Sequence, residues 1–319
     1  ETALASALKD LRRSIGDDGI RQTVVKTLRR RGYRFAAQVR DQANAPTAPR
    51  GLARPRAAER PETPVFVGRV RELAWLMERL ADAAAGRPRV VLVVGEAGIG
   101  KSSLLEQLQR EPECEDFEVV IGRCQVQASL PYLPFVEALR QWLLQNDESL
   151  DSLLGDEPGV IRQLLQPDSS MAGPLPNAEI SSGERKRAEL FAALYRVFEK
   201  LAQRRRIVLM IEDLHCADSA SLDLLRNFVA AMSDSRSKAP LPLLLVATLR
   251  PPASDDRLAR AVEDLERESI CDRRDLSGLD AVDVRELAGS LGVAAMPPRA
   301  ARQIAAATRG NPLFVREFI

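Results

Sequence analysis

Five short stretches of the chain have the residue pattern of strands, and amphipathic segments separate them. The stretches are residues 90–94, 117–122, 207–213, 241–249 and, last, 270–276. Several are nearly continuous apolar runs without alternation, as in parallel strands that are buried on both faces. Strands that alternate with helical segments form a parallel sheet covered by helices. The pattern therefore predicts a three-layer α/β domain.

The remaining segments divide the chain. Helical patterns cover parts of residues 2–15, 65–86, 130–144, 184–202 and 280–319, and residues 22–28 and 33–39 form a predicted hairpin. Residues 41–63, rich in Pro, Ala and Arg, are a predicted linker, and residues 167–183 a mobile surface insertion. We expect four parts: an N-terminal piece at 1–40, the linker at 41–63, a core at 64–276 and the start of a helical region at 277–319.

Composition narrows the class of protein. With 319 residues, 45% hydrophobic and 29% charged, the chain has the balance of a soluble protein with about two domains. No apolar run approaches the roughly 18 residues that span a bilayer, and no secretory signal is visible, so we expect a cytoplasmic location and no membrane partner. Four scattered cysteines and one histidine argue against a zinc site or a disulfide framework.

The net charge of +1 is unevenly distributed along the chain. Residues 1–60 contain fourteen Lys and Arg against six Asp and Glu, a net +8, which leaves −7 for the remainder. A helix followed by a basic-tipped hairpin suits double-stranded DNA, with the helix in the major groove. The DNA-binding candidates are Lys9, Arg12, Arg13, Arg29, Arg30 and Arg31. A solvated helix beside an edge hairpin would give the same pattern, so that alternative stays open.

The residues after the first core strand have the chemistry of a phosphate-binding loop. Gly95, Gly100, Lys101 and Ser102 fill the pattern GxxxxGK[ST] between a predicted strand and a predicted helix. Glycines let backbone N–H groups surround phosphate oxygens, and the helix N-terminus adds its positive end. Lys101 would reach the β- and γ-phosphates, and Ser102 would ligate Mg²⁺. The alternative is a glycine-rich turn with an exposed lysine.

The strand at 207–213 ends in two acids, Glu212 and Asp213. A carboxylate pair at the end of a buried strand is costly unless it meets a cation or solvent. In an open parallel sheet this edge adjoins the phosphate loop, so one acid would join the Mg²⁺ shell and the other would orient the attacking water. Which acid takes which role is left open. His215 is expected to have a structural or relay role beside them.

Three ordered motifs resemble those of STAND-class ATPases, the AAA-type signal-transduction NTPases of large bacterial regulators. They are the phosphate loop, EDLHCAD at 212–218, in which Cys216 replaces the usual tryptophan, and RGNPLFVREF at 309–318. The resemblance implies a C-terminal helical lid whose proline closes over the base, and a segment before the core that packs on adenine. It also implies that Arg250 is a γ-phosphate sensor; an arginine that ends the strand in solvent is the open alternative.

The motifs and the resemblance together define the candidate site. The nucleotide-binding set is Val67, Gly68, Arg69, Gly95, Gly98, Ile99, Gly100, Lys101, Ser102, Ser103 and Pro312. The catalytic set is Lys101, Glu212, Asp213 and Arg250, and the metal set is Ser102, Glu212 and Asp213. The implied cofactors are ATP or ADP and Mg²⁺.

A second resemblance lies within the first forty residues. Residues 8–35 resemble the end of an OmpR/PhoB-type winged-helix DNA-binding domain, with the wing positions at Thr27, Gly32, Tyr33 and Phe35. The sheet and two helices that precede the recognition helix in that family are absent from this sequence. A helix and one hairpin bury little apolar surface, so we expect a longer product or docking of this piece on its neighbour.

These features predict a STAND-type ATPase that regulates transcription, in which the nucleotide state controls oligomerisation and DNA binding. No arginine finger can be named, so hydrolysis is expected to be slow. The expected partners are double-stranded DNA, further copies of the chain when ATP is bound, and the transcription machinery or a signal ligand acting through a C-terminal sensor. The alternatives are a metabolic or motor ATPase whose N-terminal piece only assists assembly, and a DNA-binding scaffold with a degenerate ATP site.

Overall fold

The chain forms two units, Glu1–Arg60 and Pro61–Ile319. The computed structural model describes the backbone of residues 25–28 and 32–35 in the first unit. In the second it describes residues 66–125, 131–146, 159–165, 180–234, 240–252, 257–293 and 296–319.

The described part of the first unit is a β-hairpin. Strand β1 (Val25–Leu28) pairs antiparallel with β2 (Gly32–Phe35), and Leu28 lies opposite Gly32. The hairpin prediction is confirmed, except that Gly32 belongs to the returning strand and not to the tip. The predicted recognition helix, the six basic DNA-binding candidates and the linker lie outside the described residues.

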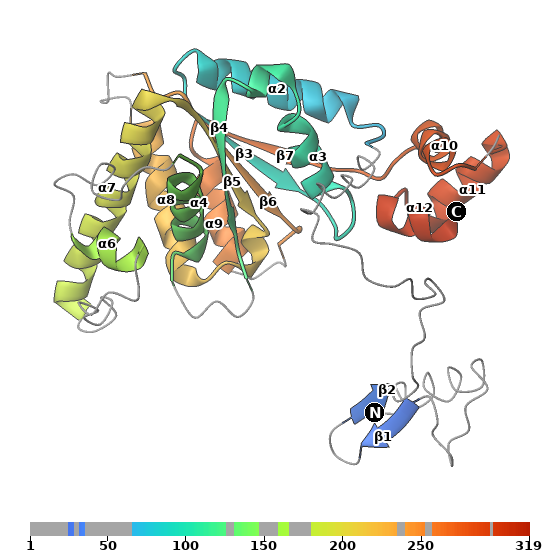
Figure 1. Cartoon of the computed structure of the whole chain (residues 1–319), viewed down its shortest axis with the longest axis horizontal. Coiled ribbons are helices and arrows are strands. Elements are labelled where there is room, and N and C mark those ends of the chain that lie inside the picture. The colour runs from blue at the N-terminus through green and yellow to red at the C-terminus, as the bar shows by residue number, and fades with distance from the viewer. Residues whose placement is uncertain are drawn as a thin grey trace, which may run out of the picture. The chain divides into compact units, whose positions relative to one another are not determined.

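The second unit is built on a five-stranded sheet whose described strand pairs are all parallel. Its strands are β3 (Arg89–Val94), β4 (Phe117–Arg123), β5 (Arg206–Glu212), β6 (Leu243–Leu249) and β7 (Cys271–Asp275). They lie in the order β4-β5-β6-β3-β7. Their ends fall within two residues of the predicted ones. In β3, β5 and β6 the reason is that the apolar run marks where the strand enters the core. Figure 1 labels the five strands within the second unit. The order places β6 between the strand of the phosphate loop and the strand of the acid pair.

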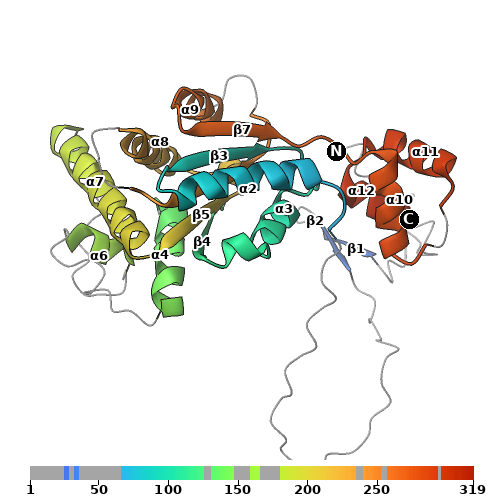
Figure 2. The same ribbon diagram turned by 90° about the horizontal axis from the view of Figure 1, so that it is seen from above.

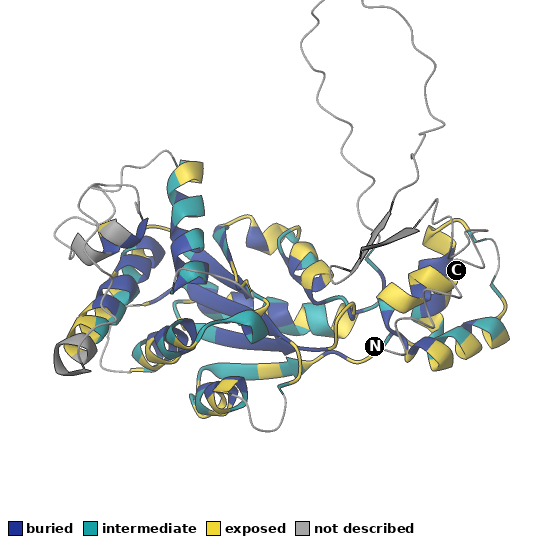
Figure 3. Cartoon of the chain, turned by 90° about the horizontal axis from the view of Figure 1, so that it is seen from below, coloured by how far each residue is buried: buried dark blue, intermediate teal, exposed yellow. Residues whose placement is uncertain are grey.

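Helices cover both faces of this sheet. One face carries α2 (Val70–Ala84) and α3 (Lys101–Leu108), whose leucines pack on alternate residues of β3, β5 and β6. The other face carries α4 (Leu133–Asn146), α6 (Gly159–Leu165), α7 (Ile180–Arg204), α8 (Ser219–Ser233) and α9 (Arg257–Glu266). The central strands are buried between the two layers (Figure 3). The three-layer α/β prediction is confirmed.

One boundary prediction was wrong. Helix α7 already begins at Ile180, so residues 180–183 are helical and not part of a mobile insertion. The polar composition of 180–183 hid a helix start that packing of the later turns supports. Of the helices in the described ranges, none is long and apolar enough to cross a membrane.

The edge strand β4 is closed off by α4. The backbone N–H of Ile121 donates to Gln141 Oε1 at 3.0 Å, and that of Arg123 donates to Glu137 Oε2 at 3.1 Å. Gly122 makes this close approach feasible, since a Cβ there would lie 1.8 Å from the Pro134 carbonyl oxygen. Helix side chains thus satisfy edge groups that could otherwise pair with another strand.

The C-terminal residues form a lid of three helices, α10 (Ala281–Ser290), α11 (Pro298–Thr308) and α12 (Pro312–Phe318). Figure 2 shows them as one group at the end of the unit. The lid has its own small core, and Val67, from the segment before α2, packs into it. The residues between β7 and α10, 276–280, are called the hinge segment below. The helices predicted within 280–319 are present.

Candidate functional site

The phosphate loop takes a backbone path that glycine makes accessible. Gly95 continues β3, and its N–H donates to the Leu249 carbonyl of β6 at 3.1 Å. Gly98 and Gly100 have φ values of 76° and 100°, a region that other residues adopt only with strain. Gly100 is the N-cap of α3, so the helix starts at Lys101 with free N–H groups at its first turn. This is the cradle that an anion needs.

Lys101 is buried, with 8% of its surface exposed. Its Nζ donates to the carbonyl oxygens of Gly95 at 2.7 Å and Glu96 at 3.0 Å. Desolvation lowers the Lys101 pKa, and the nearby Asp213 carboxylate opposes that effect. A lysine folded back onto the loop carbonyls contradicts the alternative of a glycine turn with an exposed lysine. Phosphate oxygens entering the loop would offer the ammonium better acceptors.

A pocket of about 320 Å³ opens over this loop. The loop and α3 contribute Lys101 and Ser102, the ends of β5 and β6 contribute Asp213 and Arg250, and α12 contributes Pro312. The full lining is Ala97, Gly98, Gly100, Lys101, Ser102, Ser103, Asp213, Arg250, Pro312, Leu313 and Arg316. The fold therefore gathers in one cavity the residue types that the sequence assigned to phosphate, metal and water.

The two acids are separated by the structure. Strand β5 ends at Glu212, and Asp213 follows in the left-handed region at φ 57°, its N–H donating to Thr248 Oγ1 at 3.0 Å. The Asp213 side chain is 58% exposed and lines the pocket. Glu212, by contrast, accepts from Arg123 Nε at 3.0 Å and is not among the described lining residues. Thr248 and Arg123 were not identified from the sequence.

The rest of the EDLHCAD motif places a helix cap, a histidine and a partly buried cysteine after the two acids. Asp218 is the N-cap of α8, where its carboxylate accepts from the N–H groups of Ala220 at 2.9 Å and Ser221 at 3.0 Å. His215 Nδ1 is buried 3.9 Å from Asp213 Oδ1 and has no hydrogen-bond partner among the described residues. Desolvation lowers the His215 pKa. Cys216 is half-buried against the core, which fits a packing role.

A smaller apolar pocket adjoins the first, and the two share Gly100, Ser103, Pro312 and Arg316. Its other lining residues are Phe66, Val67, Arg69, Ile99, Leu279 and Leu287. The implied base-binding residues Val67, Ile99 and Pro312 are therefore together. The pocket measures about 40 Å³, room for little more than a water molecule and too little for a purine base.

Gly68 and Arg69 connect elements around this pocket. Gly68, at φ 67°, approaches the lid so closely that a Cβ would lie 2.8 Å from the Asp283 carboxyl carbon. Gly68 is not among the described lining residues. Arg69 is buried, and its Nη2 donates to the carbonyl oxygens of Ile99, at 3.1 Å, and of Ser277 in the hinge segment. Arg69 thus links the phosphate loop to the hinge segment.

The lid contacts the phosphate loop directly. Asn311 Nδ2 donates to the Ala97 carbonyl at 2.8 Å, and the Leu313 N–H approaches the Gly98 carbonyl at 3.4 Å. A Cβ on Gly98 would lie 2.6 Å from Leu313 Cβ. Asn311 and Arg316 lie in the motif at 309–318, but only Pro312 of that motif was predicted as a site residue. Helical spacing could have indicated Arg316, because it lies four residues after Pro312 and so on the same face of α12.

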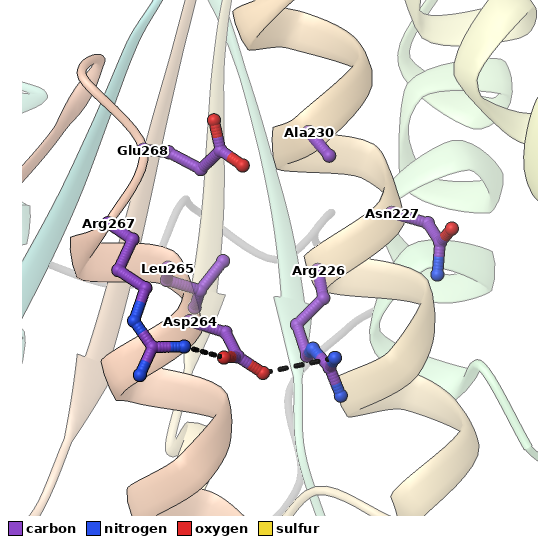
Figure 4. Close-up of a pocket in the computed structure, with 7 residues that line it drawn as sticks. All are labelled: Arg226, Asn227, Ala230, Asp264, Leu265, Arg267 and Glu268. Carbon is purple, nitrogen blue, oxygen red and sulfur yellow. Dashed lines mark hydrogen bonds and ion pairs between the residues drawn. The ribbon is translucent and has the colours of Figure 1, made fainter.

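A third hollow lies between α8 and α9, where these two helices meet (Figure 4). Asp264 accepts from Arg267 at 2.7 Å and pairs with Arg226 at 3.0 Å, so one carboxylate bridges two guanidinium groups. Its volume is about 330 Å³, and its lining shares no described residue with the phosphate pocket. We assign it a structural role.

Fold and site together define a P-loop nucleotide-binding protein of the α/β class. The AAA ATPase domain family matches residues 65–246, more than half of the chain, and the chain belongs to that family. The family implies nucleotide binding.

A curated relative and two solved structures are similar to the chain. The relative is an uncharacterized protein of Rhizobium meliloti, 26% identical over 216 residues, which is 61% of this chain and only 19% of that protein. One structure is a signal-transduction ATPase with numerous domains (STAND) and a tetratricopeptide repeat sensor from Pyrococcus horikoshii, at 18% identity and TM-score 0.44, covering 80% of this chain and 30% of that one. The other is a Walker-type ATPase of Pyrococcus abyssi, at 15% identity and TM-score 0.46, covering 78% and 66%.

Proposed function

We propose that this chain is a Mg²⁺-dependent ATP switch in which the helical lid responds to the bound nucleotide and hydrolysis is slow. The observation that carries the proposal is the contact of the lid with the phosphate loop, where Asn311 donates to Ala97 and Pro312 and Arg316 line the phosphate pocket. A triphosphate cannot enter that pocket without meeting lid residues. Binding free energy can therefore change the lid position.

The pocket residues fit a triphosphate and its metal. Lys101 would exchange its loop carbonyls for β- and γ-phosphate oxygens, and Ser102 would hold Mg²⁺, which neutralises charge between those phosphates. Asp213, exposed to the pocket, would orient the attacking water. Arg250 and Arg316 would face the γ-phosphate from the sheet and from the lid. The hydroxyl of Thr248 fixes the backbone of Asp213 for this task.

The wider role proposed here is transcriptional regulation. The support is the net charge of +8 in residues 1–60, the antiparallel hairpin of β1 and β2, and the winged-helix resemblance of residues 8–35. In this proposal the ATP-bound form self-associates and places several DNA-binding pieces on one duplex, which strengthens binding through avidity. The match covers 19% of the R. meliloti relative, so the activity and partners of the whole protein are also part of this proposal.

Two measurements on the intact protein test the proposal. The first is calorimetric titration of ATP with and without Mg²⁺; Lys101→Ala should weaken binding at least tenfold, because a buried cation at the phosphates is lost. Lys186→Ala is the matched control, since Lys186 is exposed on α7. If the parent protein fails to bind ATP, the switch is refuted and the scaffold with a degenerate site is favoured.

The second measurement is duplex DNA binding by fluorescence anisotropy with ATP, ADP or no nucleotide. We expect tighter binding with ATP, a steep loss with added salt, and no nucleotide effect in Lys101→Ala. Equal DNA affinity in all nucleotide states would refute nucleotide control. Steady ATP turnover that is unaffected by DNA would instead favour the metabolic or motor ATPase.

A further inference from the structure

An ion pair at the end of two neighbouring strands holds the first acid of the pair. Arg123 and Glu212 are direct register partners on β4 and β5, and Arg123 Nε donates to Glu212 Oε2 at 3.0 Å. The Glu212 side chain is 16% exposed and that of Arg123 is 64% exposed. Two backbone bonds fix the same corner: Cys124 N–H donates to the Glu212 carbonyl at 2.9 Å, and Arg123 N–H donates to Glu137 at 3.1 Å.

Glu212 lies on the face of the sheet that carries the phosphate-loop helix. Side chains alternate along a strand, and Val208 and Met210 pack among the leucines of α3, so Glu212 points to that same face. Helix α3 begins there with Lys101 and Ser102. Glu212 is thus on the side where a metal held by Ser102 would need a carboxylate.

The arginine now bonds Oε2, one of the two oxygens of that carboxylate. The Arg123 guanidinium carries its positive charge at any physiological pH. A charged arginine and a divalent cation compete for the same oxygen lone pairs, and the arginine also repels the cation. Asp213 remains as the acid that lines the pocket.

We propose that Arg123 is a positioning residue that weakens Mg²⁺ binding by withholding Glu212 from the metal shell. The inference rests on the proposed ATP site and adds a specific determinant to it. Ligation of the metal by Glu212 requires this side chain to leave Arg123, so removal of the guanidinium leaves the carboxylate available. An exposed ion pair is worth up to about 1 kcal/mol, which corresponds to about a fivefold change in an equilibrium constant.

The test measures the Mg²⁺ concentration that half-saturates the metal-dependent tightening of a fluorescent ATP analogue. Arg123→Ala should lower that concentration about fivefold. Arg123→Lys keeps a positive charge and should bring the concentration most of the way back to the parent value. Arg205→Ala is a closely matched control, because Arg205 pairs with Glu118 at 2.9 Å with exposures of 67% and 16%, yet lies in the turn before β5, at the other end of the strands. That variant should leave the half-saturating concentration unchanged. Mn²⁺ titration followed by electron paramagnetic resonance gives the metal affinity independently of any turnover.

The same substitution in a protein that lacks the Glu212 carboxylate separates the possible outcomes. In Glu212→Gln the Arg123→Ala change should have no effect on Mg²⁺ half-saturation, because the contested carboxylate is gone. An unchanged or raised Mg²⁺ requirement in Arg123→Ala, in protein whose thermal unfolding matches the parent, overturns the inference. If the parent binds no ATP analogue in EDTA or in Mg²⁺, the proposed function itself has failed. If it binds the analogue but Arg123→Ala shifts nothing, only the inference has failed.

Discussion

Asn311 makes two different bonds, and two substitutions can separate them. Its Oδ1 accepts from Leu313 N–H at 3.1 Å as the N-cap of α12, and its Nδ2 donates to the Ala97 carbonyl of the phosphate loop at 2.8 Å. Asn311→Ala removes both bonds. Asn311→Asp keeps a good N-cap acceptor but removes the donor to the loop. The pair of variants therefore distinguishes helix capping from lid docking.

The expected magnitudes follow from the bonds. A hydrogen bond of this kind contributes about 1 kcal/mol net, so loss of the loop bond should lower the ratio of docked to undocked lid about fivefold. In Asn311→Asp a carboxylate would also face a carbonyl oxygen, so its effect on docking should be at least as large. Asn311→Ala should in addition destabilise α12 by about 1 kcal/mol through the lost cap.

Spin-label distances can report the docked fraction. Labels at Glu106 on α3 and Arg302 on α11, both exposed, can be attached through a bioorthogonal amino acid so that the native cysteines stay unlabelled. Asn227→Asp is the matched control, because Asn227 also donates to a backbone carbonyl, that of Asp223 at 2.8 Å, but lies on α8. If Asn311→Asp gives the parent distance distribution, with and without Mg-ATP, the Asn311–Ala97 bond does not hold the lid.

Three further outcomes are expected. Gly310→Ala should lower the melting temperature more than Gly292→Ala: both glycines have positive φ, but a Cβ at Gly310 would lie 2.2 Å from the Leu279 carbonyl, whereas nothing lies within 4 Å at Gly292. Equal shifts of the melting temperature would contradict the close packing of Gly310 against the hinge segment. Asp218→Ala should cost about 1 kcal/mol in urea unfolding through the lost cap of α8, and Asp218→Asn should retain most of it; a neutral Asp218→Ala would show that the cap is dispensable. Burial raises the pKa of Cys124 from 9.0 to about 12, so between those pH values the unfolded thiol ionises first and the free energy of unfolding falls with rising pH. Cys124→Ala should make that fall shallower. If the free energy of unfolding depends on pH identically in parent and variant, Cys124 is not its cause.

The local features of the core were determined by the sequence. Apolar runs without alternation fix buried parallel strands, because only such strands are covered on both faces. The phosphate loop follows from chemistry just as local: Gly98 and Gly100 supply positive φ, and Lys101 follows them at the helix start. Each of these features depends on about ten consecutive residues, which is why the residue pattern is sufficient to predict it.

The assembly of the site was decided by the tertiary structure. The strand order inserts β6 between β3 and β5, and so brings Thr248 to the backbone of Asp213. Pairing of β4 with β5 brings Glu212 to Arg123, 89 residues earlier in the chain, whereas its neighbour Asp213 lines the pocket. Asn311 reaches the phosphate loop across 214 residues. A residue pattern specifies which groups are present and which element carries each of them, but contacts over such separations depend on how strands are ordered and how the hinge segment packs, and these follow from burial of the whole core.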